Sequence, residues 1–246
     1  DVLLTVVTNV AQLRQPGRFV SAIRDAAPEV TSIVQNVNTR RTNAILGFTN
    51  NTLWGPGTMR DKLLGCTFEI GPTTFYQTNP AQTEELYRLA IEGAALKGGE
   101  RVLDAYCGCG TIGICAASAS DAQIVGVERV EGAVKAAKRN AAANGLGEKC
   151  RFVAADATEW MAREGRDLGF DVVLMDPPRA GSTAEFLDGV AELAPERVVY
   201  VSCNVETQAR DLEYIRKKGY RIESVTPVDM FPHTKHVESV AVLVRR

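Results

Sequence analysis

Short apolar runs alternate with helix-like segments over the last two-thirds of the chain. The runs with the spacing of buried strands cover residues 102–104, 123–128, 151–153, 171–176 and 198–203. Between them, 130–144 and 205–218 carry apolar residues at helical spacing, and Gly145 and Gly219 mark their ends. Strands that alternate with helices in this way predict an α/β fold with a doubly wound, Rossmann-like parallel sheet.

The last two predicted strands break this alternation. Residues 220–230 and 238–244 both have strand character, and only a proline-containing loop separates them. A hairpin without a crossover helix reverses the chain direction. We therefore expect the last strand to be antiparallel to the rest of the sheet.

The first 79 residues follow a different pattern. The predicted elements are a strand at 2–8, a helix at 17–27, and strands at 30–37 and 43–48 that pair across 38–42. Residues 50–51 and 55–57 have the composition of turns. The sequence thus predicts a small α+β subdomain over 1–79, followed by the large α/β domain over 80–246.

Composition narrows the class of protein. Of the 246 residues, 45% are hydrophobic and 24% are charged, which excludes a disordered or fibrous chain. No apolar run approaches the roughly 18 residues of a membrane span, and no signal peptide opens the chain. The sequence begins at Asp1 without an initiator methionine, so we expect a piece of a longer protein.

Cysteine usage and charge add two expectations. None of the six cysteines forms a C-x-x-C pair, which favours a reducing cytoplasm and argues against a zinc or iron–sulfur centre. The net charge of −2 does not by itself indicate a nucleic-acid partner. Residues 1–79 hold 7 basic and 5 acidic side chains, so any excess of positive charge lies there.

A glycine-rich turn follows the first strand of the large domain. Gly108, Gly110 and Gly113 satisfy G-x-G-x-x-G, and Glu128 ends the next strand. Glycines let a ligand approach the backbone, and an acid at this place grips ribose hydroxyls. The pattern fits either a nicotinamide dinucleotide or S-adenosylmethionine.

Acids at other strand ends favour the second cofactor. The Asp104 carboxylate precedes the glycines and suits a cationic sulfonium better than a pyrophosphate. Asp156 follows the third strand, where it can reach an adenine amino group. The fourth strand ends in Asp176-Pro177-Pro178-Arg179, a rigid loop typical of methyltransferases that present a planar base.

Two further strand ends carry reactive groups whose roles the sequence leaves open. Cys203 follows the fifth strand and is either a small buried residue or a nucleophile. A helix that begins after it favours a lowered thiol pKa. Glu238 opens the last strand as a cap or a functional carboxylate. His233 and His236 are weak evidence for a metal, and we predict no metal site.

Five ordered motifs together resemble the RNA (uracil-5-)-methyltransferases. They are Phe75-Tyr76-Gln77-Thr78-Asn79, the glycine turn, Asp176-Pro177-Pro178-Arg179, Ser202-Cys203-Asn204 with Ala209-Arg210-Asp211-Leu212, and Phe231-Pro232-His233-Thr234 with His236-Val237-Glu238. The resemblance spans nearly the whole chain. Residues 29–36 and 104–108 look most like the bacterial branch that acts on 23S ribosomal RNA.

The resemblance implies specific roles. Cys203 would be the nucleophile and Glu238 the general base. The cofactor-binding set would be Gln77, Asp104, Tyr106, Gly108, Gly110, Thr111, Glu128, Asp156 and Asp176. The candidates for RNA contact are Phe75, Asn79, Pro177 and Arg179. Family members usually carry an upstream TRAM domain and often an iron–sulfur cluster, and we expect neither within this chain.

The predicted function is S-adenosylmethionine-dependent methylation of C5 of a uridine in 23S ribosomal RNA. A thiolate adds to C6, C5 accepts the methyl group, and a base removes the C5 proton. The thiolate must be populated, so we expect the site to lower its pKa. Methylation of the transfer RNA T-loop is the nearest alternative. A nicotinamide-dependent oxidoreductase and a non-catalytic RNA-binding sensor of the cofactor are more distant ones.

Overall fold

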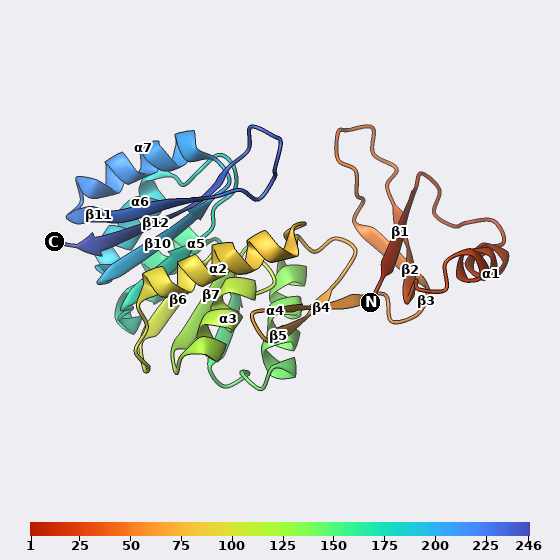
Figure 1. Ribbon diagram of the computed structural model, residues 1–246, viewed down its shortest axis with the longest axis horizontal. Coiled ribbons are helices and arrows are strands. Elements are labelled where there is room, and N and C mark those ends of the chain that lie inside the picture. The colour runs from red at the N-terminus through yellow and green to blue at the C-terminus, as the bar shows by residue number, and fades with distance from the viewer. The chain divides into compact units, whose positions relative to one another are not determined.

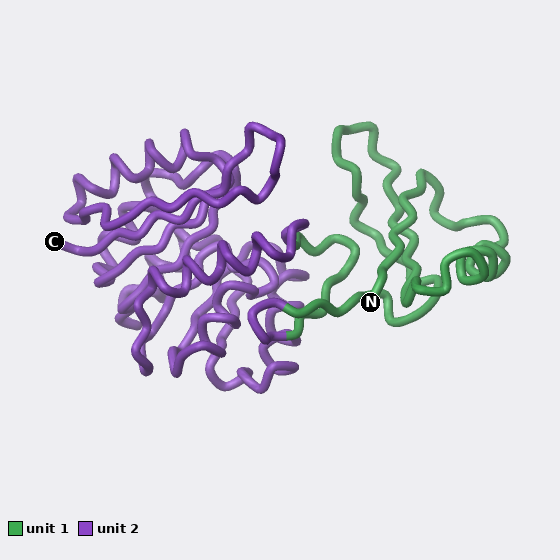
Figure 2. The backbone as a smooth tube through the Cα atoms, viewed as in Figure 1, with its two compact units in different colours: residues 1–62, 67–76 green, residues 63–66, 77–246 purple.

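The computed structural model describes residues 1–246 and divides them into two units (Figure 2). Unit 1 comprises Asp1–Lys62 and Thr67–Tyr76, and unit 2 comprises Leu63–Cys66 and Gln77–Arg246. The sequence suggested one division, after residue 79. In the structure, residues 63–66 belong to unit 2 although the residues on either side of them belong to unit 1. These four residues form the tip of a hairpin whose remaining residues lie in unit 1.

Unit 1 is built on a three-stranded sheet with the strand order β1-β2-β3. Its elements are β1 (Leu3–Thr8), α1 (Pro16–Ala26), β2 (Ser32–Val37) and β3 (Thr49–Trp54). β1 and β2 are parallel, and α1 is the crossover between them. β2 and β3 are antiparallel, with Val37 opposite Thr49. The predicted strand at 2–8 and helix at 17–27 correspond to β1 and α1.

The predicted strand at 43–48 is wrong, because β3 begins after it. The backbone at Gly47 lies so close to β2 that an added Cβ would be 1.8 Å from the Val37 carbonyl oxygen. Gly47 also exchanges hydrogen bonds with the Asn36 side chain. That side chain donates to Asn50 Oδ1 at 2.7 Å, which places a residue with turn character inside a strand.

A second hairpin was not predicted. β4 (Met59–Leu63) and β5 (Cys66–Ile70) are joined by Leu64 and Gly65, which have φ angles of 48° and 81°. Two left-handed residues match the twist of a tight hairpin. Leucine rarely adopts this conformation, so the sequence carried no turn signal there.

Unit 2 contains a seven-stranded sheet with the order β11-β12-β10-β9-β6-β7-β8. Its strands are β6 (Arg101–Ala105), β7 (Gln123–Glu128), β8 (Cys150–Ala154), β9 (Val172–Met175), β10 (Arg197–Ser202), β11 (Tyr220–Val228) and β12 (Glu238–Arg245). β12 is antiparallel to both of its neighbours, and the remaining pairs are parallel. The predicted α/β fold with an antiparallel last strand is confirmed.

Helices cover both faces of this sheet (Figure 1). They are α2 (Pro80–Ala94), α3 (Thr111–Ala119), α4 (Glu131–Ala143), α5 (Ala157–Trp160), α6 (Ala184–Leu193) and α7 (Val205–Arg216), with short π and 3₁₀ turns at Met161–Gly165 and Arg166–Leu168. α2, α3 and α4 contact one another in series on one side, and α5, α6 and α7 form the other layer. The inner strands β6, β7, β9, β10 and β12 are almost wholly buried between these layers, whereas the edge strands β8 and β11 are partly exposed.

One glycine illustrates how tightly this sheet is packed. An added Cβ at Gly126, in β7, would lie 2.4 Å from the Phe152 ring and 2.9 Å from Cys107 Sγ. A side chain at this position would push β8 away from the glycine turn. Glycine in a strand interior is otherwise unfavourable, so the close approach explains its use here.

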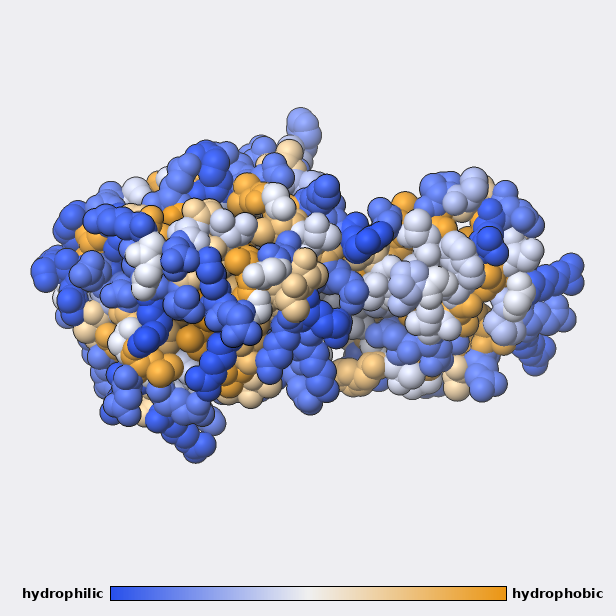
Figure 3. Space-filling view, turned by 90° about the horizontal axis from the view of Figure 1, so that it is seen from below, coloured by the Kyte–Doolittle hydropathy of each residue, from blue (hydrophilic) through white to orange (hydrophobic).

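The surface is mainly hydrophilic on the face shown in Figure 3, with hydrophobic residues in scattered patches. Scattered exposed apolar side chains are normal for a folded protein. No helix combines the length and the apolar character that crossing a bilayer requires.

Candidate active site

The acidic and nucleophilic side chains predicted from the sequence meet at one edge of the unit 2 sheet. This edge carries the carboxyl ends of the parallel strands and, because β12 runs the other way, the start of β12. In the order of the strands from β12 to β8, the residues along it are Glu238, Cys203, Asp176, Tyr106, Glu128 and Asp156. Ligands of open α/β sheets bind outside this edge.

Two carboxylates shape the glycine turn. Asp104 is buried at the end of β6 and accepts a hydrogen bond from the Gly113 N–H at 3.0 Å. Glu128 accepts from the Gly108 N–H at 3.3 Å and from the Val130 N–H at 2.8 Å. Gly108 has a φ of 55°, and the space where its Cβ would lie is open. The backbone of the turn is therefore fixed by these two carboxylates, and the side of Gly108 where a Cβ would lie is open.

Tyr106 adopts an unusual backbone conformation at the start of this turn. Its φ is 62°, in a region that bulky residues seldom occupy. Its ring packs against Phe186, with the ring centroids 5.0 Å apart. Backbone strain of this kind clusters at ligand sites, where surrounding contacts hold it in place. The structure thus fixes an aromatic ring beside the glycine turn.

The other predicted cofactor residues have assigned places. Thr111 begins α3, and its hydroxyl lies 3.1 Å from the Tyr87 hydroxyl. Asp156 caps α5 by accepting from the Thr158 N–H at 2.9 Å, and Gly110 has a φ of 83°. Gln77 precedes α2 and is half-buried. Their contact with a cofactor stays a prediction.

The electrostatics of this edge favour a cation. Burial raises the pKa of Asp104 to about 7, and the nearby Glu128 charge adds to the shift. Burial raises the pKa of Asp176 to about 8, with further contributions from Glu238 and Asp104. Carboxylates that resist ionisation side by side are stabilised by a positive charge placed among them. S-adenosylmethionine carries a sulfonium and an ammonium group, so these residues fit it.

The predicted nucleophile and base lie at neighbouring ends of two adjacent antiparallel strands, β10 and β12. Ser202 pairs with Ser239 in the register of β10 and β12, so the next residues outward are Cys203 and Glu238. Antiparallel residues opposite one another have Cα atoms about 4.5–5.5 Å apart. Glu238 is 3% exposed, whereas Cys203 is the one cysteine of the chain that is not buried. Of the two side chains, only the Cys203 thiol is therefore open to solvent in this structure.

The expected lowering of the Cys203 thiol pKa is wrong for the chain alone. Burial raises this pKa, and the carboxylates of Glu238 and Asp176 raise it further. The positive charge of Arg179 opposes them with a smaller effect. α7 begins after Cys203, but these contributions outweigh any favourable effect of the helix. A further positive charge beside Cys203, such as the sulfonium of a bound cofactor, would lower this pKa.

This yields a prediction for thiol reactivity. The rate of Cys203 alkylation by iodoacetamide, followed against pH, should reach its midpoint above that of an ordinary cysteine, because burial and two carboxylates raise the thiol pKa. S-adenosylmethionine should move the midpoint to lower pH. S-adenosylhomocysteine is the matched control, since it lacks only the methyl group and its positive charge. Equal midpoints with the two ligands would contradict the argument.

The Asp-Pro-Pro-Arg loop is anchored to the helix that follows Cys203. The Arg179 carbonyl oxygen accepts hydrogen bonds from Asn204 Nδ2 and Thr207 Oγ1, both at 3.3 Å. The Arg179 guanidinium lies 3.4 Å from His236 Nδ1. Pro177 is buried, whereas Arg179 is exposed. The loop thus connects the ends of β9 and β10 to the segment that precedes Glu238 and β12.

Sequence reasoning named Arg210 and Asp211 only as part of a motif, and the structure gives them a positioning role. Asp211 is 2% exposed and accepts from the Ser182 N–H at 2.7 Å and the Tyr200 hydroxyl at 2.8 Å. Arg210 donates to Asp211 and to the carbonyl oxygens of Ala180 and Ser182. The sequence signal for this role was a pair of adjacent, oppositely charged residues in the helix that packs beside the rigid proline loop.

The remaining predicted residues fall outside this cluster of reactive groups. Asn79 caps α2 by accepting from the Gln82 N–H, and it donates to the Met230 carbonyl oxygen at 3.1 Å. Phe75 belongs to unit 1 and is 77% exposed. Their roles in RNA contact stay predictions. No group of three or more metal-binding side chains occurs in the structure.

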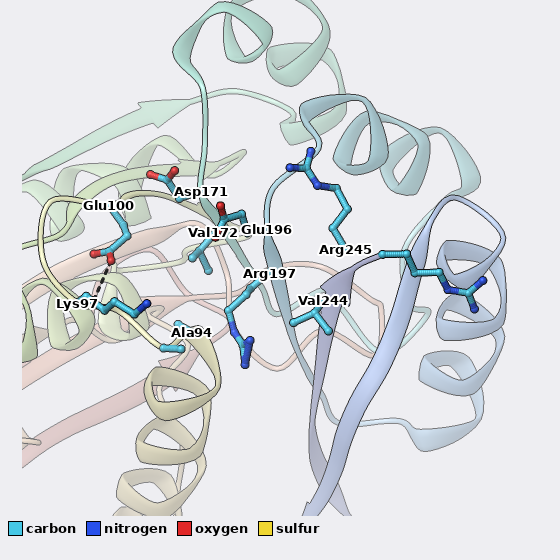
Figure 4. Close-up of a pocket in the computed structure, with 11 residues that line it drawn as sticks. Ala94, Lys97, Glu100, Asp171, Val172, Glu196, Arg197, Val244 and Arg245 are labelled. Atoms are coloured by element: carbon cyan, nitrogen blue, oxygen red, sulfur yellow. Dashed lines mark hydrogen bonds between the residues drawn. The ribbon is translucent and has the colours of Figure 1, made fainter.

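A separate cavity of about 470 Å³ lies at the opposite edge of the unit 2 sheet (Figure 4). Its lining includes the first residues of β9 and β10 and the end of β12. Three of the charged side chains labelled there have structural contacts: Glu100 accepts from the Lys97 N–H, Asp171 accepts from the Arg101 N–H, and Arg197 donates to the Gly93 carbonyl oxygen. None of the predicted site residues lines this cavity.

Comparison with known proteins identifies related sequences. The tRNA (uracil-5-)-methyltransferase family model matches residues 64–246. An uncharacterized RNA methyltransferase from Lactiplantibacillus plantarum is 45% identical over 247 residues, covering 100% of this chain and 54% of the relative. One from Staphylococcus aureus is 44% identical over 242 residues, covering 98% and 53%. The chain spans about half the length of the relatives it matches.

Solved structures agree with this relationship. The Pyrococcus abyssi tRNA (uracil-54, C5)-methyltransferase in complex with S-adenosyl-L-homocysteine has a TM-score of 0.82 and 33% identity, covering 98% of this chain and 56% of that one. The precorrin-6y C5,15-methyltransferase from Geobacter metallireducens has a TM-score of 0.54 and 16% identity, covering 66% and 89%. The second comparison shows the fold alone.

Proposed function

The chain belongs to the tRNA (uracil-5-)-methyltransferase family, and we propose that it transfers a methyl group to C5 of a uridine in RNA. S-adenosylmethionine supplies an electrophilic methyl group on a positively charged sulfur. The carboxylates of Asp104, Glu128 and Asp176 would hold this cationic cofactor at the sheet edge. Cys203 and Glu238 would act on the uracil ring.

The chemistry requires both of these groups. The Cys203 thiolate forms an Sγ–C6 bond and moves the electrons of the C5–C6 double bond toward C5. C5 then takes the methyl group, and the electrons of the bond to sulfur stay with the cofactor product. Glu238 removes the C5 proton. The electron pair of that C–H bond restores the double bond and expels the thiolate.

One observation carries the proposal: a half-buried thiol and a buried carboxylate lie opposite one another at a ligand-binding sheet edge. The match of residues 64–246 to a methyltransferase family model, and the 33% identity to a methyltransferase solved with S-adenosyl-L-homocysteine, argue against a nicotinamide oxidoreductase. The raised pKa values of Asp104 and Asp176 would fall beside a cation and rise further beside a pyrophosphate, so this edge favours the cationic cofactor. A sensor that only binds cofactor and RNA would need neither Cys203 nor Glu238.

The adduct between protein and RNA gives the direct test. Fluorine at C5 cannot leave as a proton does, so RNA containing 5-fluorouridine should stop the reaction as a methylated adduct joined through Cys203. Intact mass after denaturation, followed by peptide mapping, identifies the product. Absence of a methylated adduct when S-adenosylmethionine is present, or an adduct that maps to another residue, would contradict the proposed mechanism.

Glu238→Gln should accumulate a covalent adduct even with ordinary uridine RNA. The amide cannot accept the C5 proton, so elimination of the thiolate stops after methyl transfer. We expect turnover to fall by on the order of 10² to 10⁴ while the adduct becomes visible on a denaturing gel. Glu223→Gln is the matched control, because Glu223 lies in β11 and pairs with Arg197 on the surface. A variant that loses turnover without trapping RNA would exclude this role for Glu238.

For the RNA substrate we propose 23S ribosomal RNA, from the resemblance of residues 29–36 and 104–108 to that branch. Transfer RNA is the second candidate, because the 33% identical Pyrococcus abyssi protein is a tRNA methyltransferase. Competition between 23S fragments and transfer RNA transcripts, with incorporation of a labelled methyl group, separates the two. Preferential labelling of transfer RNA would overturn the ribosomal assignment.

A further inference from the structure

The loop between β2 and β3 holds two large apolar side chains in solvent. Phe48 is 87% exposed and Ile45 is 78% exposed, both among the most exposed large hydrophobic residues of the chain. The loop covers residues 38–48 and belongs to unit 1. A single exposed apolar side chain is ordinary at a protein surface, so what distinguishes Phe48 is its surroundings.

The conformation of the 38–48 loop is fixed by hydrogen bonds of its own polar side chains. Asn38 Nδ2 donates to the carbonyl oxygens of Ala44 and Ile45 at 2.7 and 2.9 Å, and Asn38 Oδ1 accepts from the Arg40 N–H. At the base of the loop, Asn36 exchanges hydrogen bonds with Gly47. Hydrogen bonds of Asn36 and Asn38 therefore fix the backbone of the 38–48 loop, and the side chains of Phe48 and Ile45 are not needed to hold it.

An arginine is stacked on the exposed ring. The Arg40 guanidinium carbon lies 4.3 Å from the centroid of the Phe48 ring, and its Nη2 donates to the Leu46 carbonyl oxygen at 2.7 Å. This contact covers one face of the ring, and the exposed fraction shows that the rest is open. The similar pair of Arg24 and Trp54 differs, because Trp54 is half-buried and forms part of the fold.

The surrounding sequence lacks negative charge. From Val30 to Met59 the chain has no aspartate or glutamate, yet it contains Arg40 and Arg41. Neither arginine forms a salt bridge. Unpaired cations, an open aromatic ring and an absence of carboxylates are the combination that single-stranded nucleic acid needs for phosphate contact and base stacking.

We infer that the 38–48 loop is a stacking platform for an unpaired base of the RNA, separate from the uridine that is methylated. Phe48 stacks on the base, and Arg40 holds the ring while it contacts a phosphate. Ile45 widens the apolar surface beside them. This inference rests on the proposed function for the identity of the partner, and it assigns RNA recognition to unit 1.

The test is binding of a fluorescein-labelled single-stranded oligouridine of about twelve nucleotides to the chain, followed by fluorescence anisotropy. Phe48→Ala should weaken binding about tenfold, because stacking on an aromatic ring is lost. Phe48→Leu should lose as much, since it keeps the apolar surface but not the ring. Phe48→Trp should bind within about twofold of the unchanged chain.

The salt dependence isolates the phosphate contact. Arg40→Gln should weaken binding and reduce the slope of log affinity against log salt by about 0.7, the value for one phosphate of a single strand. Phe48→Ala should leave that slope unchanged. Arg101→Gln is the charge-matched control, because Arg101 begins β6 at the edge of the sheet away from the reactive groups. Thermal unfolding of each variant should match the unchanged chain.

Several results would overturn the inference. They are no measurable binding by the unchanged chain, full binding by Phe48→Ala or Phe48→Leu, and loss of a dimer in Phe48→Ala without loss of RNA affinity, which would make the loop a protein interface. Failure of the proposed function is distinguishable. In that case the 5-fluorouridine adduct does not form on Cys203, while oligouridine binding still depends on Phe48.

Discussion

Cys203→Ala is expected to abolish methylation of RNA while leaving the binding of S-adenosylmethionine within a few fold. Without the thiol no bond to C6 forms, and C5 of uracil is then too weak a nucleophile to take the methyl group. Loss of an enzyme nucleophile lowers turnover by on the order of 10⁴ to 10⁶. Transfer of a labelled methyl group measures turnover, and calorimetry measures cofactor affinity.

The control for this variant is Cys150→Ala, the same substitution at a buried cysteine in β8. It removes a sulfur from the core, so it reports any loss of activity that comes from destabilisation alone. Cys203 is half-exposed, and its truncation should leave the thermal midpoint nearly unchanged. Normal methylation by Cys203→Ala would exclude nucleophilic catalysis at this residue.

Asp211→Ala should produce the largest loss of stability among the variants considered. The substitution leaves the Tyr200 hydroxyl and the Ser182 N–H without their partner and removes the counter-charge of Arg210. Breaking such a buried arrangement costs about 3 kcal/mol or more. For a chain of this size that corresponds to a fall of roughly 6–12 °C in the thermal midpoint, measured by circular dichroism.

Asp211→Asn separates positioning from folding. The amide fills the same space and still accepts from Ser182, but it no longer neutralises Arg210, which ties Ala180 and Ser182 to α7. We expect turnover to fall about tenfold at a temperature where the variant is folded, with cofactor affinity unchanged. Glu213→Ala is the control, since Glu213 forms only exposed ion pairs on α7. Equal losses of turnover and cofactor affinity would argue for a merely structural role.

Much of unit 2 could be predicted from sequence, for a physical reason. Buried parallel strands need uninterrupted β-branched and apolar runs, and 123–128 and 198–203 are such runs. The rule that ligands bind at the carboxyl edge then brings Asp176 and Cys203 to one place without any knowledge of distances. The antiparallel direction of β12 followed from the missing crossover helix and added Glu238 to that edge.

The features that were missed depend on contacts between distant residues. The prediction of a strand at 43–48 was wrong because the contacts between Asn36 and Gly47 set the end of the loop. Neither of these residues has a strong strand preference that the sequence could reveal. The pKa of Cys203 was wrong because the helix after it is local, whereas Glu238 comes from a strand 35 positions further along the chain. The sequence around Cys203 therefore cannot predict the effect of a carboxylate that only strand pairing brings close to the thiol.

The pairing of β10 with β12 determines where insertions and deletions can occur without moving Cys203 relative to Glu238. The register that sets Ser202 opposite Ser239 fixes the separation of thiol and carboxylate through backbone hydrogen bonds. The segment between β11 and β12, residues 229–237, lies outside that ladder. Insertions there alter what approaches the site, whereas a single deletion within β12 would turn its side chains to the opposite face. The segment 229–237 can thus vary in length without changing the spacing of Cys203 and Glu238.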